Sequence, residues 1–321
     1  MLKGECVMDN LVSIIIPSYN EEDNIENTAK TILDIMDNAS INCELIFVSD
    51  GSNDKTFEKI LSLSKNEIRV KGIEFSRNFG KEAAIIAGLK KGNGACFVVM
   101  DCDLQHPPEV IVEMYRKWEE GFEIVEGIKL ERGKESIIYK AFSNLFYKLI
   151  SKFTGYPMKN TSDFKLIDKK VVDILINLPE RKPFFRALSL WTGFKSVNVK
   201  YKVGVRNIGN SKWSVMGLIK YAISNIISFS TIPLDIITYI GVLFILGALA
   251  LGVHTLVYYF MGKAQEGFAT VILLILISGG AILISIGIIG KYIAAIYEEV
   301  KHRPRYLVRL DTDKNYDEQG F

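Results

Sequence analysis

The sequence lacks the cysteine and leader patterns of an exported protein. Its four cysteines form no Cys-x-x-Cys pair and show no metal-ligand spacing, which is typical of reduced thiols in the cytosol. The first apolar run, Leu11 to Pro17, is too short for a secretory signal and leads directly into acidic residues. We therefore expect the body of the protein to stay in the cytosol, and we assign no function to Cys6, Cys43, Cys96 and Cys102.

The sequence also lacks a strong net charge. It has 39 basic and 37 acidic residues, which leaves a formal charge of +2. This value is too small to favour nucleic acid as a partner. The basic residues cluster beside the apolar runs described next, so anionic lipid headgroups are the expected counter-charge.

Charged side chains are nearly absent from Ile236 to Gly290, where only His254, Lys263 and Glu266 interrupt the apolar sequence. Two uncharged runs in this stretch exceed the about 20 residues that a helix needs to cross a bilayer. They predict a transmembrane hairpin, with His254 near an interface; two core helices of a soluble domain are the disfavoured alternative. The runs are Ile236–Phe260, of 25 residues, and Phe268–Gly290, of 23 residues.

Basic residues flank the two runs on one side. The connecting loop, Met261 to Gly267, has only one lysine and one glutamate. Because loops rich in lysine and arginine stay in the cytoplasm, both termini are expected there. The flanking basic residues are Lys195, Lys200, Lys202, Arg206, Lys212 and Lys220 before the first run, and Lys301, Arg303, Arg305 and Arg309 after the second.

Up to about residue 230 the sequence reads as a globular α/β body. Four short apolar or β-branched runs alternate with three stretches of helical spacing, which predicts a mainly parallel sheet with helices on both faces. The expected strands are Leu11–Ser18, Cys43–Ser49, Ile68–Ser76 and Ala95–Asp101. The expected helices are Glu22–Asn38, Asp54–Lys65 and Lys81–Lys91.

Polar residues follow each expected strand. In open α/β sheets ligands bind at the carboxyl ends of the strands, so these residues should converge on one crevice. The segments are Pro17–Glu22, Asp50–Ser52, Arg77–Lys81 and Asp101–Asp103.

Asp101 and Asp103 are two residues apart, so both carboxylates project to one side while the chain stays extended. Oxygen ligands without histidine or cysteine favour Mg²⁺ or Mn²⁺. Taken alone, an Asp-x-Asp motif is weak evidence for a metal site, and a solvated turn is the alternative. Its placement between a strand and a helix, with Pro107 or Pro108 at the first helical position, favours the metal site.

Four segments together resemble the family 2 glycosyltransferases of the GT-A fold: PSYNEEDNI, SDGSNDKT, SRNFGKEAAIIAGL and DCDLQHPPEV. The resemblance extends to NTSDFKLIDKKVV, ERKPFFRAL, GNSKWS and the terminal hairpin, and so covers nearly the whole chain. Within the family, the sequence is most similar to bacterial polyprenyl-phosphate glycosyltransferases and dolichol-phosphate mannose synthases.

The resemblance implies a donor site for a nucleotide-sugar. Asp101 and Asp103, the latter also counted as catalytic, would hold the metal and diphosphate with Gln105. Arg77 and Lys81 flank the segment Asn78–Gly80 just before a helix, so their cations and the helix amino end could face diphosphate oxygens; an exposed basic turn is the alternative. The expected nucleoside contacts are Pro17, Tyr19, Glu21 and Asp50, the last preceded by Ser49 where many relatives have a second Asp.

Asp163 matches the carboxylate that inverting members place next to the acceptor, where its usual label is general base. A lipid monophosphate has a second pKa of about 6 and is largely dianionic in the cytosol, so it needs little deprotonation. Asp163 could instead orient the acceptor or stabilise charge on the sugar. The expected phosphate ligands are Arg181, Arg186, Arg206, Ser211 and Lys212, with membrane anchoring without substrate contact as the alternative.

The predicted reaction is inverting transfer of a hexose to undecaprenyl phosphate at the bacterial cytoplasmic membrane, with Mg²⁺ or Mn²⁺ as cofactor. UDP-glucose is the favoured donor, and GDP-mannose, UDP-GlcNAc and UDP-galactose are alternatives. A polymerising synthase, an inactive nucleotide-sugar scaffold and a homo-oligomer stay open. The expected regions are a catalytic domain (1–194), a basic juxtamembrane segment with an amphipathic helix (195–231), two transmembrane helices (232–297) and a basic tail (298–321).

Overall fold

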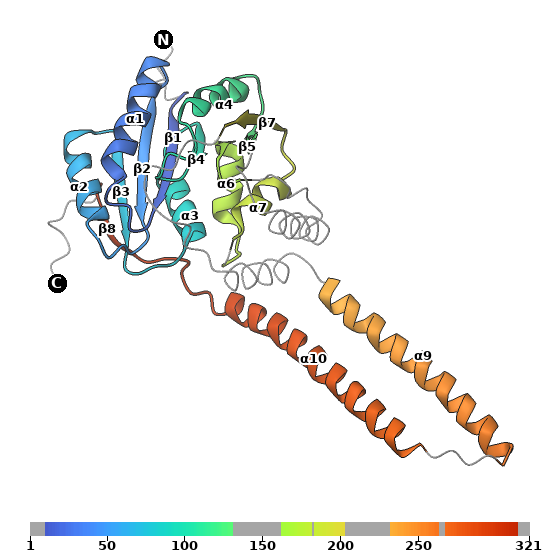
Figure 1. The fold of residues 1–321 in the computed structure, drawn as a ribbon. Coiled ribbons are helices and arrows are strands. Elements are labelled where there is room, and N and C mark those ends of the chain that lie inside the picture. Colours follow the sequence, from blue (N-terminus) through green and yellow to red (C-terminus); the bar gives the residue numbers. More distant parts are fainter. Residues whose placement is uncertain (1–9, 131–161, 182, 203–231, 263–266, 314–321) are drawn as a thin grey trace, which may run out of the picture. The chain divides into compact units, whose positions relative to one another are not determined.

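The computed structural model describes residues 10–130, 162–181, 183–202, 232–262 and 267–313. The chain divides into two units, one of Met1–Lys212 with Arg303–Phe321 and the other of Trp213–His302. The first unit contains a sheet with helices, and the second contains two long helices (Figure 1).

Eight strands of the described residues form one sheet: β1 (Val12–Ser18), β2 (Cys43–Ser49), β3 (Val70–Phe75), β4 (Cys96–Val99), β5 (Ile124–Lys129), β6 (Lys165–Asp168), β7 (Ser196–Tyr201) and β8 (Val308–Asp311). Their order is β7-β5-β6-β4-β1-β2-β3-β8. The central strands β4, β1, β2 and β3 are parallel, whereas β6 and β8 run antiparallel to their neighbours β4 and β3. The expected mainly parallel sheet is confirmed.

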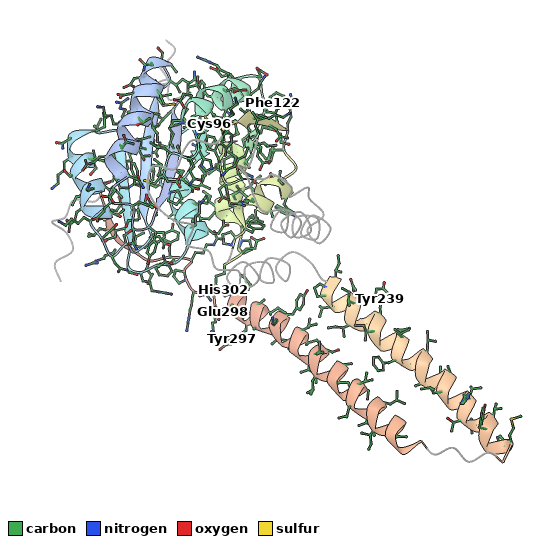
Figure 2. The ribbon with its side chains drawn as sticks, in the orientation of Figure 1. Cys96, Phe122, Tyr239, Tyr297, Glu298 and His302 are labelled. Atoms are coloured by element: carbon green, nitrogen blue, oxygen red, sulfur yellow. The ribbon has the colours of Figure 1, made fainter. Side chains whose placement is uncertain are left out.

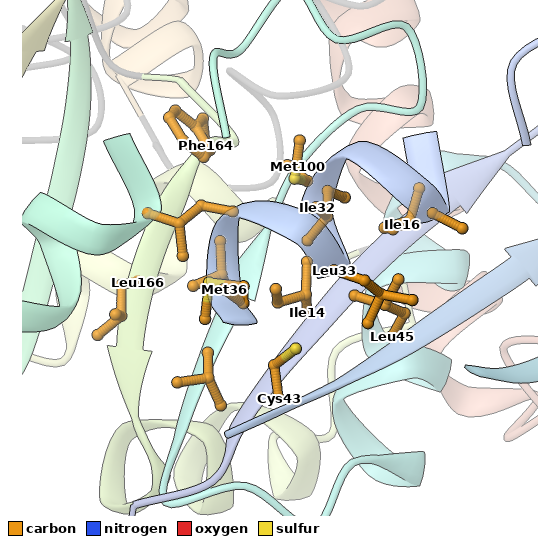
Figure 3. Close-up of a cluster of buried hydrophobic side chains, with 14 of the residues drawn as sticks. Ile14, Ile16, Ile32, Leu33, Met36, Cys43, Leu45, Met100, Phe164 and Leu166 are labelled. Atoms are coloured by element: carbon orange, nitrogen blue, oxygen red, sulfur yellow. The ribbon is translucent and has the colours of Figure 1, made fainter. Parts of the chain in front are cut away.

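Helices cover both faces of this sheet: α1 (Ile25–Asn38), α2 (Thr56–Asn66), α3 (Lys81–Lys91), α4 (Glu109–Glu119), α6 (Lys169–Asn177) and α7 (Phe185–Trp191). Side chains alternate along β1, so Ile14 and Ile16 join one apolar cluster with Ile32 and Met36 of α1 (Figure 3). Ile15 faces α3 on the opposite side. The two layers of helices therefore rest on the same central strand.

Two strands come from segments that the sequence analysis placed outside the catalytic domain. β7 lies in the expected juxtamembrane segment and pairs in parallel with β5. β8 lies in the expected basic tail and pairs with β3. Val197, Val199 and Tyr201 do alternate along β7, but the basic residues around both strands favoured a juxtamembrane segment and a tail over strands of the sheet. The sheet therefore extends further along the chain than expected.

The second unit contains α9 (Ile232–Phe260) and α10 (Phe268–Val300). Both are long and apolar enough to cross a membrane, over Ile232–Tyr258 and Leu274–Val300, with none of their most apolar windows buried. Figure 2 shows side chains projecting outward along both helices, including Tyr239 and Tyr297. The helices contain the two runs expected from the sequence, and α10 continues ten residues beyond the expected end at Gly290.

The closest approach between α3 and the sheet depends on a glycine. A Cβ atom on Gly88 would lie 2.2 Å from Cγ2 of Ile15. Real carbon atoms do not approach so closely, so no larger residue fits without a shift of α3. This close packing also fixes the position of the amino end of α3, which begins at Lys81.

We predict that Gly88→Ala lowers the free energy of unfolding, because overpacking a core costs about 1–3 kcal/mol. Leucine has no Cγ2 methyl, so Ile15→Leu in the same chain should recover part of the loss. Chemical denaturation of the purified protein measures both variants. Equal stability of Gly88→Ala and the parent chain would contradict the predicted clash.

Candidate active site

The loops that follow β1 and β2 are bound to each other. The Asn20 amide donates to Ser52 Oγ at 3.1 Å, and the Asn53 amide donates to Asn20 Oδ1 at 2.9 Å. Asn20 has a φ of 54°, a left-handed conformation that asparagine tolerates better than most residues. The two strand ends therefore present their polar residues as one surface, with Tyr19 exposed on it.

The loop from Arg77 to Gly80 is docked on the end of β2. Asp50 is buried, and its carboxylate accepts from the amides of Phe79 at 2.6 Å and Gly80 at 2.9 Å. Burial raises the pKa of Asp50, and the two amides partly offset that effect. A Cβ on Gly51 would lie 2.3 Å from the carbonyl carbon of Arg77, so this residue too must be small.

Lys81 joins two strand ends through its ammonium group. Its Nζ lies 2.5 Å from Asp101 Oδ1 and 2.9 Å from Asp163 Oδ2. A cation in the first turn of a helix is opposed by the helix dipole. Burial lowers the pKa of Lys81, but the two carboxylates outweigh that effect and raise it. Lys81 is therefore held by the site rather than by its helix.

Asp163 is the most heavily paired carboxylate of the site. It is 7% exposed and accepts from Arg186 Nε at 2.6 Å and Nη2 at 2.9 Å, in addition to its contact with Lys81. Burial raises its pKa, but Lys81 and Arg186 outweigh this and hold the pKa well below its usual range. Asp163 is therefore ionised at neutral pH and is a weak base.

Asp101 and Asp103 do not lie on an extended strand, which corrects the geometry expected from their spacing. β4 ends at Val99, and the chain turns through Leu104, whose φ is 54°. Asp103 Oδ1 accepts from the Gln105 amide at 3.2 Å. In the described part of the chain, no three His, Cys, Asp or Glu residues are grouped to hold a metal.

Two carboxylates nevertheless fit a Mg²⁺ or Mn²⁺ ion, because these metals keep waters and take substrate phosphates as further ligands. Burial raises the pKa of Asp101, but the neighbouring Lys81 ammonium outweighs this and lowers it, so the carboxylate is ionised. The amide oxygen of Gln105 adds a hard ligand of the same class. The donor set thus agrees with the metal that the sequence predicts.

His106 supports the Asp101 turn. Its ring is 4% exposed, stacks on Phe164 with centroids 4.8 Å apart, and meets Tyr201 edge-on. Nδ1 accepts from the Asp101 amide at 3.4 Å. Burial lowers the pKa of His106 to about 4, so the ring is neutral at physiological pH. These contacts favour a structural role over proton donation.

A buried ion pair beneath Asp163 was not predicted from the sequence. Glu126 of β5 and Lys165 of β6 are opposite each other in the sheet, with Nζ 3.3 Å from Oε1. Glu126 accepts from the Ser162 amide, and Lys165 Nζ donates to Ser189 Oγ at 2.8 Å. One pair thus contacts the residue before Asp163 and the helix that carries Arg186. The available signal was the presence of Glu126 and Lys165 next to apolar residues of two short strands.

Glu82, also unpredicted, holds the start of α7. Its Oε2 accepts from the Phe185 amide at 3.0 Å, next to Arg186 in sequence. Burial and the charge of Asp163 raise the pKa of Glu82 to about 7. The helix with Arg186 is therefore fixed at Phe185 by α3 and at Ser189 by β6.

The structure brings together only some of the residues predicted from the sequence. Lys81, Asp101, Asp163 and Arg186 form one network, in which Arg186 contacts Asp163. Glu21 accepts from Asn24 Nδ2 at 2.6 Å, at the amino end of α1. Pro17 is within β1, and Arg181 precedes α7. Arg206, Ser211 and Lys212 lie outside the described residues, and their role stays a prediction.

We predict that Lys165→Met lowers the free energy of unfolding by about 3–5 kcal/mol, because it leaves Glu126 buried without its cation. The double variant Lys165→Met with Glu126→Gln should lose less, since no charge is left uncompensated and the glutamine oxygen can still accept from Ser162. Denaturant titration of both variants checks this. A single variant as stable as the double one would show that the pair does not couple.

The chain matches the model of Glycosyl transferase family 2 over residues 13–173. An uncharacterized glycosyltransferase of Synechocystis is 39% identical over 92% of this chain and 94% of its own. A bactoprenol glucosyl transferase of Shigella phage SfV is 35% identical over 94% and 99%. The glucosyl-3-phosphoglycerate synthase of Mycobacterium tuberculosis, solved with Mn²⁺, UDP and phosphoglyceric acid, shares the fold at 18% identity, covering 68% and 78%, with a TM-score of 0.52. This chain belongs to glycosyltransferase family 2, and its first unit has a GT-A-like fold.

Proposed function

We propose that this glycosyltransferase transfers a hexose, with glucose from UDP-glucose as the first choice, to undecaprenyl phosphate at the cytoplasmic face of a bacterial membrane. The observation that carries the proposal is the Lys81 ammonium, which contacts both Asp101 and Asp163. It joins the expected donor and acceptor halves in one charged network. The bactoprenol glucosyl transferase of phage SfV, which matches nearly the whole chain, supports a lipid phosphate as acceptor.

In the donor half, Asp101, Asp103 and Gln105 would hold Mg²⁺ or Mn²⁺. When bound, the metal neutralises charge on the diphosphate. Arg77 and Lys81 add cations toward the same oxygens. The surface formed by Pro17, Tyr19, Glu21 and Asp50 would bind the nucleoside. Asp50 still has free lone pairs after accepting from Phe79 and Gly80, because a carboxylate offers about four acceptor sites.

In the acceptor half, an oxygen of the lipid phosphate attacks the anomeric carbon. The bond from that carbon to the diphosphate breaks with inversion, and the nucleoside diphosphate leaves with the electron pair. A dianionic phosphate needs no base for this step. Asp163, whose pKa is held low, orients the acceptor through Arg186 and stabilises positive charge on the sugar. Arg181, Arg206, Ser211 and Lys212 are the further proposed phosphate ligands.

The membrane arrangement belongs to the same proposal. α9 and α10 would span the bilayer as a hairpin, with the catalytic unit and both termini in the cytoplasm. Of the expected juxtamembrane segment 195–231, β7 belongs to the sheet. The part that contains Trp213 lies outside the described residues, and its place along the headgroups stays a prediction. Holding enzyme and lipid in one plane favours their encounter, because the reacting groups are already close.

The central test is product identification. The purified full-length chain is incubated with undecaprenyl phosphate, Mg²⁺ or Mn²⁺, and each of UDP-glucose, UDP-galactose, UDP-GlcNAc and GDP-mannose. We expect mass spectrometry to find a hexosyl-phospholipid with one preferred donor, and Asp101→Asn to reduce its formation at least about a hundredfold, as for loss of a key electrostatic group. Transfer to a soluble sugar or protein would overturn the assignment of a lipid phosphate as acceptor. If neither transfer nor hydrolysis of any nucleotide-sugar is observed, a non-catalytic scaffold is favoured.

We further predict that Asp163→Asn slows turnover without removing an essential base from the pH profile. Asp163 stays ionised as pH falls through about 4, where an ordinary Asp titrates, because its folded pKa is depressed. The kcat of the parent chain should therefore be limited on its acid side by the second ionisation of the lipid phosphate, at a pKa of about 6. A pH–rate series on parent and variant measures this. If the pH–rate profile of the parent has one acid limb and that limb is missing in Asp163→Asn, Asp163 is a general base instead.

A further inference from the structure

The segment that follows α10 returns to the catalytic unit and lies against the donor-site loop. β8 pairs with β3 at the edge of the sheet, where Figure 1 shows the two strands side by side. We propose that Tyr306, in this C-terminal segment, is a positioning residue for the loop Arg77–Gly80 and thereby for the binding of the donor diphosphate. This inference rests on the proposed function, in which Arg77 faces that diphosphate.

The C-terminal segment is anchored at several points. Arg305 donates to the carbonyl of Leu178, after the end of α6. At the other end, Lys91 Nζ lies 2.6 Å from Asp311 Oδ1 and 2.7 Å from Asp313 Oδ2. Charge-assisted contacts of this kind are stronger than neutral hydrogen bonds, so they tie the end of β8 to the end of α3. Tyr306 therefore has a defined position between two anchors.

An unbroken series of aromatic contacts leads from Tyr306 to Arg77. The Tyr306 ring stacks on Phe75 with centroids 4.8 Å apart and planes 13° from parallel. Phe75 meets Phe79 edge-on at 5.8 Å. The Arg77 guanidinium carbon lies 4.4 Å from the centre of the Phe79 ring. The guanidinium thus rests on a ring whose own support comes from the C-terminal segment.

The loop is held from two opposite directions. Asp50 and Gly51 fix its backbone from the end of β2. On the other side, the Ser76 amide donates to the Leu307 carbonyl at 3.0 Å, directly beside Tyr306. Asp50 determines where the backbone amides lie, whereas among the described residues it is the Phe79 ring that contacts the Arg77 side chain. Removing Tyr306 should therefore leave the loop folded and loosen its cation.

Arg77 is exposed, and an exposed arginine loses side-chain entropy when it is fixed in one conformation. Because Arg77 already stacks on Phe79 before the donor binds, part of this entropy is lost beforehand, and the entropic cost of donor binding is smaller. Tyr306 follows the end of α10 at Val300 by six residues. The chain that leaves the apolar hairpin thus contributes directly to the donor loop, which gives the C-terminal segment a role beyond anchoring.

The test measures donor affinity and acceptor kinetics separately. Full-length parent, Tyr306→Ala, Tyr306→Leu and Tyr306→Phe are titrated calorimetrically with UDP and with GDP in the presence of Mn²⁺, and the tighter nucleotide is used throughout. We expect Tyr306→Ala and Tyr306→Leu to raise its Kd and the donor KM roughly threefold to tenfold, as for loss of a stacked aromatic pair. Tyr306→Phe should bind like the parent, and the acceptor KM should not change.

Lys91→Met is the matched control, because it loosens β8 at Asp311 and Asp313 without touching the rings. A rise in Kd equal to that of Tyr306→Ala, or a Tyr306→Leu chain that binds like the parent, would overturn the inference. Arg77→Ala and Asp101→Asn are the references for the donor site itself. If neither nucleotide binds the parent chain, or both references bind normally, the proposed function fails at its donor half. If Arg77→Ala and Asp101→Asn weaken nucleotide binding and Tyr306→Ala does not, the donor site stands and only the role proposed for Tyr306 is contradicted.

Discussion

The site depends on one ammonium group placed between two carboxylates. Lys81 would be unfavourable at the start of α3 unless anions faced it, and Asp101 and Asp163 supply them at 2.5 and 2.9 Å. That placement requires Gly80, whose φ of 100° disfavours any other residue, and Gly88, which lets α3 lie close to Ile15. The position of the Lys81 ammonium between the two carboxylates therefore depends on how closely α3 packs against the sheet.

A second charged pair, Lys165 with Glu126, is buried next to this network. Lys165 is fully buried and Glu126 is 6% exposed, and such pairs are costly because desolvation offsets much of their attraction. They are therefore weak evidence for stability alone. Their hydrogen bonds to Ser162 and Ser189 suggest another reason for their presence, since those residues set the positions of Asp163 and Arg186. The pair fixes a geometry that apolar side chains of equal volume would leave undetermined.

Local pattern predicted the central part of the fold because its strands and helices alternate along the chain. β2 and α3 have the bounds expected from their apolar spacing, and β1 begins one residue later. The strands β7 and β8, which were not predicted, depend on contacts between residues that are far apart in the sequence. The Gly72 amide, for example, donates to Thr312 Oγ1, 240 residues away. Motifs likewise indicated Asp101, Lys81 and Asp163, but not that they touch. Asp101 and Asp103 were expected on an extended strand, whereas a left-handed Leu104 turns the chain there.

Charge balance explains how such a closed network could still accept substrates in the proposed reaction. Without ligands, the cations of Lys81 and Arg186 neutralise Asp101 and Asp163, so neither carboxylate repels an incoming phosphate by its full charge. A metal held by Asp101 and Asp103 would compensate Asp101 in place of Lys81, and the Lys81 ammonium would then be able to contact phosphate oxygens of the donor. An acceptor phosphate competes for Arg186 in the same way. The buried carboxylate of Asp163 stays compensated as long as it keeps one of its two cations, so the proposed reaction requires Lys81 or Arg186 to remain in contact with it while the phosphates bind.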